Sequence, residues 1–220
     1  ALLRSVSPLV EPLSLDEAFI DLEASSLTSY DVAQVRDFAT ALKQQVHEVT
    51  GGITASVGVG SSKFIAKVAS ELEKPDGLTI VSPGAELDLL RPMNVTTIPG
   101  VGPATAERLR RAGIVTIRDL EGASLEEIVR LVGKAHGKGL FQLARAEDDR
   151  RIEPERETKS VSVEGTYDTD LTDRSLMEGL LTRQAANVSE RLRKHRLSGR
   201  TLTITVRLHD FTTLNMRNHK

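Results

Sequence analysis

The stretch that decides the fold spans residues 54–81, and it reads T-A-S-V-G-V-G-S-S-K-F-I-A-K-V-A-S-E-L-E-K-P-D-G-L-T-I-V. Residues 54–60 have the composition of a strand, and Ser61 or Ser62 can cap a helix that runs to about Glu73. The K-P-D-G segment that follows is typical of a turn, and residues 78–81 predict a second strand. A strand, a helix and a strand in succession indicate a sheet domain with helices packed on it.

The residues before this stretch add one helix and two strands. Residues 31–50 place apolar side chains at helical spacing between a capping Asp31 and a Gly-Gly pair. Residues 10–22 read V-E-P-L-S-L-D-E-A-F-I-D-L, and we interpret them as two short strands that meet near Asp16. Residues 1–82 are therefore predicted to form a domain that mixes strands and helices.

The rest of the chain changes character twice, so the predicted fold class is α+β with several domains. Residues 83–146 contain short helical segments separated by glycine and proline, with no convincing strand. Residues 147–158 are highly charged and predict a solvated linker. Residues 159–220 predict, in order, a strand over 160–167, a helix over about 173–195, a strand over 201–209 and the start of another strand.

Composition excludes several classes of protein and site. The 220 residues contain no cysteine, which excludes disulfides, cysteine-ligated zinc and a thiol nucleophile and fits a reducing cytoplasm. No apolar run approaches the roughly 20 residues that span a bilayer, so we expect no membrane partner. The five histidines are scattered without the spacing of metal ligands.

Charge is distributed unevenly along the chain. The formal net charge is −2, but residues 1–99 carry 7 basic and 13 acidic side chains, and residues 159–220 carry 11 and 7. From Arg191 to Lys220 there are 8 basic residues and one acidic residue. We interpret this last stretch as a strand, a turn and a strand that lie along a phosphate backbone; a solvated helix end is the alternative.

Asp16 and Glu17 form the first candidate site. Neighbouring carboxylates on a strand usually face opposite ways, but at a strand end both can lean toward one point. Two carboxylates together would bind Mg²⁺ in the presence of a phosphate ligand. A solvated turn is the alternative, and the apolar residues around the pair weigh against it because unpaired charges among them are costly.

Three lysines could act on such a site. Lys63 and Lys67 are four residues apart on one face of a predicted helix, and Lys74 lies in the turn that follows. Their spacing is not that of a phosphate-binding P-loop, and a solvated lysine is the simpler interpretation of each. Lys74 is the best candidate, because its turn could aim it back at the acidic pair.

Residues 98–114 carry a different candidate site, and they read I-P-G-V-G-P-A-T-A-E-R-L-R-R-A-G-I. Gly100 and Gly102 allow a tight turn before a helix, whose first N–H groups would attract an anion. A tight turn without a ligand is the alternative. The pattern is more specific than that, and it resembles a helix-hairpin-helix motif, which holds DNA phosphate without reading the base sequence. Residues 133–143 could be a second, degenerate copy.

The motifs together resemble a known family of enzymes. Their order and spacing are similar to those of Y-family translesion DNA polymerases of the bacterial polymerase IV (DinB) type, over nearly the whole chain. This resemblance implies a DNA-directed DNA polymerase of the bacterial cytoplasm and nucleoid, which uses two Mg²⁺ ions for nucleotidyl transfer. The motifs are S-L-D-E-A-F-I-D-L from Ser14, T-A-S-V-G-V-G-S-S-K-F-I-A-K-V-A-S from Thr54, K-P-D-G from Lys74, I-P-G-V-G from Ile98 and K-S-V from Lys159.

The same resemblance implies domains and residue roles. Asp16 resembles a ligand of the two ions, Glu17 the catalytic carboxylate beside it, and Lys74 the lysine that reaches the triphosphate of the incoming nucleotide. The implied domains are a partial palm with a ferredoxin-like sheet (1–82), a thumb with its helix-hairpin-helix at 94–114 (83–146), a tether (147–158) and the start of a little finger (159–220). The residues expected at the DNA backbone are Gly100, Val101, Gly102, Ala104, Lys159, Ser160, Val161, Arg207 and Arg217.

The implied partners are primer–template DNA, deoxynucleoside triphosphates and, in a longer protein, a sliding clamp; the chain is expected to be a monomer. The family's opening strand, with a further metal-binding Asp, and its fingers have no counterpart before Ala1. We therefore expect a piece of a longer protein that is catalytically incomplete alone. Two rival functions stay open: a non-catalytic helix-hairpin-helix DNA-binding module, and a repair nuclease that uses Asp16 and Glu17.

Overall fold

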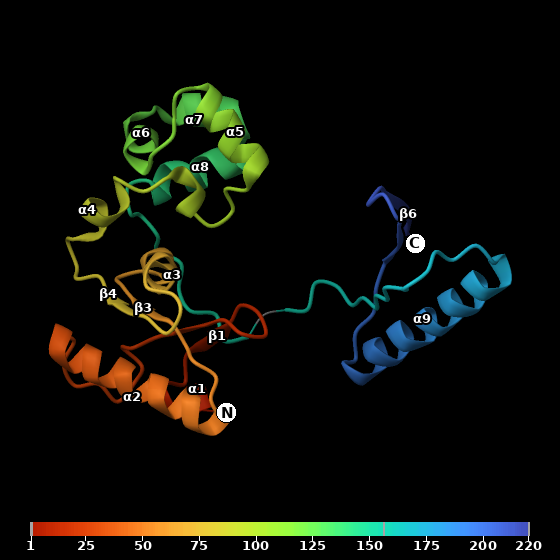
Figure 1. The fold of residues 1–220 in the computed structure, drawn as a ribbon, viewed down its shortest axis with the longest axis horizontal. Helices are drawn as coiled ribbons and strands as arrows, with labels where there is room; N and C mark the ends of the chain where they lie inside the picture. Colours follow the sequence, from red (N-terminus) through yellow and green to blue (C-terminus); the bar gives the residue numbers. More distant parts are fainter. Residues whose placement is uncertain (1, 156, 220) are drawn as a thin grey trace. The chain divides into compact units, whose positions relative to one another are not determined.

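The computed structural model describes residues 2–155 and 157–219, and the chain divides into two compact units, residues 1–155 and 156–220 (Figure 1). In the first unit the elements are α1 (Leu2–Val6), β1 (Val10–Pro12), β2 (Ala18–Ile20), α2 (Val32–Thr50), β3 (Val57–Val59), α3 (Lys63–Leu72), β4 (Leu78–Ile80), α4 (Glu86–Leu90), the 3₁₀ helix η1 (Val95–Thr97), α5 (Pro103–Arg111), α6 (Ile117–Gly122), α7 (Leu125–Val132) and α8 (Lys134–Leu143). The second unit contains α9 (Arg174–Lys194), β5 (Thr201–Arg207) and β6 (Thr213–His219).

The stretch that decides the fold forms the predicted strand, helix and strand. Strands β3 and β4 run parallel, with Val57 opposite Leu78. The Ser62 side chain accepts a hydrogen bond from the N–H of Ile65 and so caps α3. Helix α3 buries one face, and four of its apolar side chains are at most 1% exposed: Phe64, Ile65, Val68 and Ala69. This packing makes α3 the central element of the first unit's sheet region (Figure 1).

Two further predictions about this region are confirmed. Strands β1 and β2 pair antiparallel, with Pro12 opposite Ala18, so the turn between them contains Asp16. Helix α2 begins after Asp31, whose side chain accepts from the N–H of Gln34, and it ends at Gly51 in the left-handed conformation. Helix α1 was not predicted from the sequence.

Residues 86–143 form short helices, as predicted. Apolar side chains from all of them meet in one cluster with residues of α3. Gly137 lies against α7, and a Cβ at this position would come within 2.8 Å of the Cα of Val129. Glycine therefore lets α8 approach α7 closely.

The first part of the predicted linker contacts the first unit. The Asp148 carboxylate accepts a hydrogen bond from the N–H of Phe64 at 2.9 Å, and it forms an ion pair with Arg150 at 2.6 Å. The N–H of Glu153 donates to the Glu11 carboxylate at 2.8 Å. These bonds hold residues 148–153 beside β1 and the start of α3.

In the second unit, one predicted strand is wrong. Residues 160–167 form no strand, since the only ladder among residues 157–219 joins β5 to β6. A strand needs a partner, and composition alone does not supply one. Helix α9, capped by Asp173, and the β5–β6 hairpin agree with the prediction. No helix within the described residues is both long and apolar enough to cross a membrane.

Candidate nucleotide and nucleic-acid site

The Asp16–Glu17 pair lies in the turn between β1 and β2. The N–H groups of Leu13 and Ser14 both donate to the carbonyl oxygen of Glu17, which closes the turn. The Ser14 hydroxyl donates to the Asp16 carboxylate at 2.6 Å. This bond lowers the pKa of Asp16, and the charges of Lys74 and Lys67 lower it further. Asp16 is exposed, and its lowered pKa leaves it ionised at neutral pH.

A row of ion pairs connects this turn to the turn after α3. Lys67 contacts Glu17 at 2.5 Å and Glu71 at 2.8 Å, and Glu71 contacts Lys74 at 2.8 Å. Hydrogen bonds from Lys67 and Lys74 lower the pKa of Glu71. We call these four residues the Glu17–Lys74 row. Of the predicted site residues, the row thus connects Glu17 with Lys74, and Asp16 precedes Glu17 in the same turn.

Lys63 and Lys67 are not solvated lysines. Lys63 is 8% exposed and forms an ion pair with Glu11, which is completely buried. Glu71 was not singled out as a site residue, although its i, i+4 spacing from Lys67 on a predicted helix was a visible signal. Glu11, which pairs with Lys63, and Glu17, which pairs with Lys67, lie 50 or more residues away along the chain, where sequence spacing gives no signal.

The helix-hairpin-helix segment has the predicted turn. Gly100 has φ 95°, a conformation that favours glycine, and Gly102 is the residue before α5, whose first residue is Pro103. A Cβ at Gly102 would meet no atom within 4 Å, so internal packing does not require glycine there. Gly100, Gly102 and Ala104 are exposed, whereas Val101 is buried in the apolar core and its N–H donates to the carbonyl oxygen of Ile98 at 3.0 Å.

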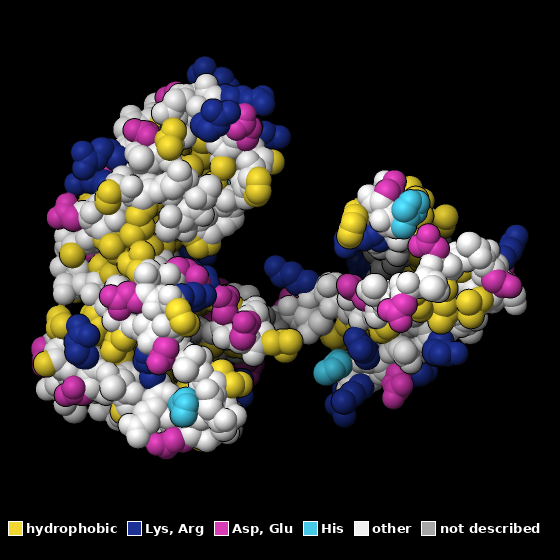
Figure 2. Space-filling view, viewed as in Figure 1, with side chains coloured by type: hydrophobic (Ala, Val, Ile, Leu, Met, Phe, Trp, Pro, Cys, Tyr) yellow, Lys and Arg dark blue, Asp and Glu magenta, His cyan; other side chains and the backbone are white. Residues whose placement is uncertain are grey.

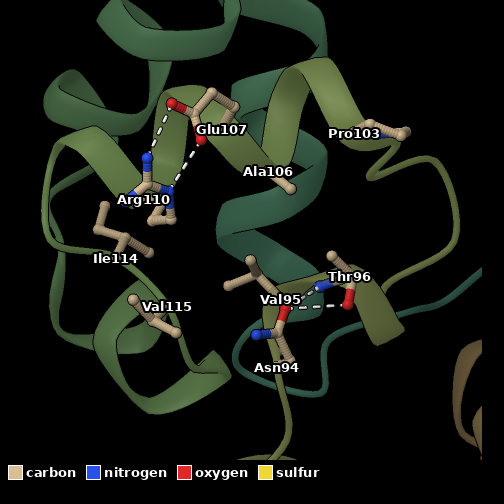
Figure 3. Close-up of a pocket in the computed structure, with 9 residues that line it drawn as sticks. All are labelled: Asn94, Val95, Thr96, Pro103, Ala106, Glu107, Arg110, Ile114 and Val115. Carbon is tan, nitrogen blue, oxygen red and sulfur yellow. Dashed lines mark hydrogen bonds and ion pairs between the residues drawn. The ribbon is translucent and has the colours of Figure 1, made fainter.

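Arginines gather at the C-terminal end of α5, the end away from this turn. Arg108, Arg110 and Arg111 lie in its last turn, and Figure 2 shows basic side chains over this end of the first unit. Arg110 and Arg111 form ion pairs with Glu107 at 2.8 and 2.9 Å. Figure 3 shows the Glu107–Arg110 pair beside a hollow of about 250 Å³ between η1 and α5. None of the predicted site residues lines this hollow.

In the second unit the predicted residues fall into two groups. Arg207 lies opposite Thr213, and Arg217 lies opposite Thr203, so both arginines share one face of the β5–β6 hairpin. Lys159 and Ser160 are exposed, and Val161 is half-buried. Next to them, Arg191 donates to the carbonyl oxygen of Ser162 at 2.7 Å. Arg191, which belongs to the basic stretch, thus has an intramolecular partner.

No group of three or more His, Cys, Asp or Glu side chains that could hold a metal ion occurs among residues 2–155 and 157–219. Within that part of the chain, Asp16 and Glu17 are therefore candidates for a site completed by ligands other than further carboxylates.

Comparison with known families and relatives matches most of the chain. Residues 1–71 match the impB/mucB/samB family, and residues 158–220 match the C-terminal domain of the same family. The two matches cover more than half of the chain. The chain belongs to the impB/mucB/samB family. Between the two family domains, residues 93–137 match a SAM-like helix-hairpin-helix tandem, which confirms the predicted motif.

Named relatives of this impB/mucB/samB chain are polymerases. A DNA polymerase IV from Streptomyces coelicolor is 52% identical over 213 residues, which are 97% of this chain and 44% of the relative. A DNA polymerase IV from Alkalilimnicola ehrlichii is 39% identical over 96% of this chain and 58% of its own length. The chain thus spans about half the length of these relatives.

Solved structures similar to this family member support the predicted fold. A chimeric Y-family DNA polymerase has a TM-score of 0.81 and 25% identity, and it covers 100% of this chain and 62% of its own. A DinB-family error-prone DNA polymerase from Sulfolobus solfataricus has a TM-score of 0.65 and 23% identity over 99% of this chain and 63% of its own. The predicted resemblance to the Y-family and the mixed α and β fold are confirmed.

Proposed function

We propose that this chain forms the palm, thumb and part of the little finger of an error-prone translesion DNA polymerase. The observation that carries the proposal is the Glu17–Lys74 row, which connects the turn of the Asp16–Glu17 carboxylate pair to the turn lysine Lys74. Carboxylates that hold a cation and a lysine that binds phosphate are the two halves of a nucleoside triphosphate site. Relatives named DNA polymerase IV support template-directed nucleotidyl transfer as the reaction that uses this site.

The carboxylates fit Mg²⁺. Asp16 is ionised because its pKa is lowered, and the Glu17 side chain is 39% exposed and accessible to an ion. Mg²⁺ is usually held by one or two carboxylates together with phosphate oxygens and waters, which is the donor set available here. In this proposal Asp16 and Glu17 would hold the metal, whose charge would favour ionisation of the primer 3′-hydroxyl and offset the charge of the triphosphate.

The other residues of the row supply charge and position. Lys74 offers a cation to the phosphates of the incoming deoxynucleotide. Lys67 holds the Glu17 carboxylate in place through their ion pair until a metal competes for its oxygens. Holding reactants in place and matching their charge are the main contributions that a protein makes to phosphoryl transfer.

The DNA-binding residues lie outside this row. We place Gly100, Val101, Gly102 and Ala104 at one backbone of the primer–template, where N–H groups of the glycine turn and of the start of α5 can bind phosphate. Lys159, Ser160, Val161, Arg207 and Arg217 would contact another part of the backbone. Deoxynucleoside triphosphates and DNA are the proposed partners in the bacterial cytoplasm, and docking to a sliding clamp belongs to the longer protein.

A primer-extension assay with Mg²⁺ and the four deoxynucleotides tests this function in a longer protein that contains the chain. Extension on undamaged and damaged templates, lost on Asp16→Asn, would support the proposal. Cleavage of the DNA would favour the repair nuclease, and binding without either reaction would favour the non-catalytic module. The 220-residue chain alone is expected to give no extension above that of its Asp16→Ala variant, since two carboxylates are few for two ions.

A further inference from the structure

Lys43 of helix α2 binds the turn that carries Lys74. Lys43 forms an ion pair with the Asp76 carboxylate at 3.0 Å. Its Nζ also donates to the carbonyl oxygen of Asp76 and, at 3.2 Å, to that of Gly77. The Lys43 side chain is 16% exposed, so these contacts are largely shielded from water. One ammonium group thus binds three acceptors of a turn that lies 33 residues further along the chain.

The backbone of this turn needs such support. Asp76 has φ 58°, a left-handed conformation that side chains with a Cβ rarely adopt. The next residue has no room for a side chain, because a Cβ at Gly77 would lie 2.3 Å from the carbonyl oxygen of Glu73. The N–H of Gly77 donates to the Ser56 hydroxyl at 3.3 Å. Such unfavourable conformations persist where surrounding contacts fix them, and they cluster at functional sites.

We propose that Lys43 is a positioning residue for Lys74. By binding Asp76 and Gly77, Lys43 fixes the backbone of the turn that carries Lys74. From this turn the Lys74 side chain contacts Glu71 and would reach the nucleotide. Lys43 does not itself contact the triphosphate in this proposal. The inference rests on the proposed role of Lys74 in binding phosphate, and it adds a residue from a helix that supplies none of the predicted site residues.

Acylation of Lys74 gives a direct readout of its position. The 220-residue chain would be treated with an acetylating reagent, and the modification of Lys74 would be followed by mass spectrometry with and without Mg·dATP. Lys43→Met removes the contacts to the turn, and Lys43→Arg keeps a cation there. Arg36→Met is the matched control, because it removes an exposed cation from the same helix.

Losing hydrogen bonds from a charged donor should release Lys74 from Glu71 and raise its acylation rate by about three-fold or more in Lys43→Met. We expect protection by Mg·dATP to require a concentration about ten-fold higher than in the wild type, which is the equivalent of about one such bond. Lys43→Arg and Arg36→Met should behave like the wild type. If Lys43→Met does not fold, Asp76→Asn, which removes only the ion pair, should show the same changes to a smaller extent.

Two outcomes separate this inference from the function on which it rests. Equal acylation of Lys74 in the wild type and in the folded variants of Lys43 and Asp76 would overturn the positioning role. A raised rate in Lys43→Met, together with no protection of wild-type Lys74 by Mg·dATP, would support the hold of Lys43 on the turn and overturn the phosphate-binding role of Lys74.

Discussion

Glu11 is a charged residue that is completely buried, and its partners explain why the chain tolerates it. Lys63 forms an ion pair with it, the N–H of Glu153 donates to it, and the Lys63 ammonium lies 5.7 Å from the centre of the Phe19 ring. Burying one charge without the other is expensive. The sequence could predict the helix that carries Lys63, but it could not reveal a partner 52 residues earlier.

Lys63→Met is expected to lower the free energy of unfolding of the first unit by about 3–5 kcal/mol, since it removes the ammonium group that pairs with the buried Glu11 carboxylate. Urea unfolding followed by circular dichroism measures this loss. Lys138→Met, at an exposed position of α8, is the control and should change stability by less than about 0.5 kcal/mol. A loss below about 1 kcal/mol in Lys63→Met would show that the pair is dispensable.

Asp148 is expected to make the free energy of unfolding of the first unit depend on pH in the acidic range. Burial raises its pKa, but hydrogen bonds from Arg150 and from the N–H of Phe64 outweigh burial and leave the pKa below its usual value. A carboxyl with a lowered pKa in the folded state contributes stability above its unfolded pKa of about 3.9, and that stability is lost as the pH falls through the lower folded value.

The wild type should therefore lose more stability than Asp148→Asn as the pH falls from about 5 to about 3. This range extends about one pH unit above and below the pKa of aspartate in the unfolded chain. Urea unfolding at several pH values in this range measures the difference between the two proteins. Asp149→Asn, at the exposed neighbouring residue, should follow the wild type. Parallel curves for the wild type and Asp148→Asn would contradict the assignment.

At the scale of elements, local signals predicted the helices well, and contacts between elements decided the rest. Asp31, Ser62 and Asp173 all cap helices as their sequence contexts indicate. Residues 160–167 look like a strand but have no strand to pair with among residues 157–219. The Glu17–Lys74 row was beyond local signals as well, because it joins a hairpin turn to α3 through side chains. The sequence analysis named Glu17, Lys67 and Lys74 as candidates, but it missed Glu71 and the ion pairs that connect these residues.

Strand β3 and helix α3 touch backbone to backbone at a glycine. A Cβ at Gly58 would lie 2.1 Å from the carbonyl oxygen of Ala66 and 2.2 Å from the backbone nitrogen of Ser70. Gly58→Ala should therefore push α3 off the sheet and destabilise the first unit by about 3 kcal/mol or more, at the upper end of overpacking effects. Thermal or urea unfolding measures the change.

The matched control is Gly139→Ala on α8, where a Cβ would meet nothing within 4 Å. Alanine suits a helix better than glycine, so this variant should gain about 0.5–1 kcal/mol. If both glycine variants unfolded at the same denaturant concentration, the close approach of α3 to β3 would not limit stability.

At the scale of the whole molecule, a net charge of −2 conceals regions of opposite sign. The helical part of the first unit and the hairpin of the second present exposed arginines, whereas the first 99 residues are acidic. Attraction to DNA is set by the phosphates that such local cations neutralise, so a nearly neutral chain can still bind DNA. The charge of each block was readable from the sequence; the shared face of Arg207 and Arg217 required the pairing register of β5 and β6.

The double variant Arg207→Ala/Arg217→Ala should bind primer–template DNA more weakly at every sequence tested. If each arginine neutralises one phosphate, the slope of log affinity against log salt should become shallower by about 2. Fluorescence anisotropy over a salt series measures both quantities. Arg174→Ala, which removes an exposed arginine of α9 paired with Glu178, is the control, and an unchanged slope in the double variant would exclude a phosphate contact.

The hydrogen bonds of Asp148 and Glu153 also limit the length of the free linker between the two units. Because the linker is anchored up to residue 153, it has fewer free residues than the whole charged segment 147–158. A shorter linker raises the effective concentration of one tethered binding module near the ligand of the other, as long as it can still span the distance. The buried carboxylates of Asp148 and Glu11 would thus affect how quickly, in the proposed function, binding of the second unit to DNA follows binding of the first.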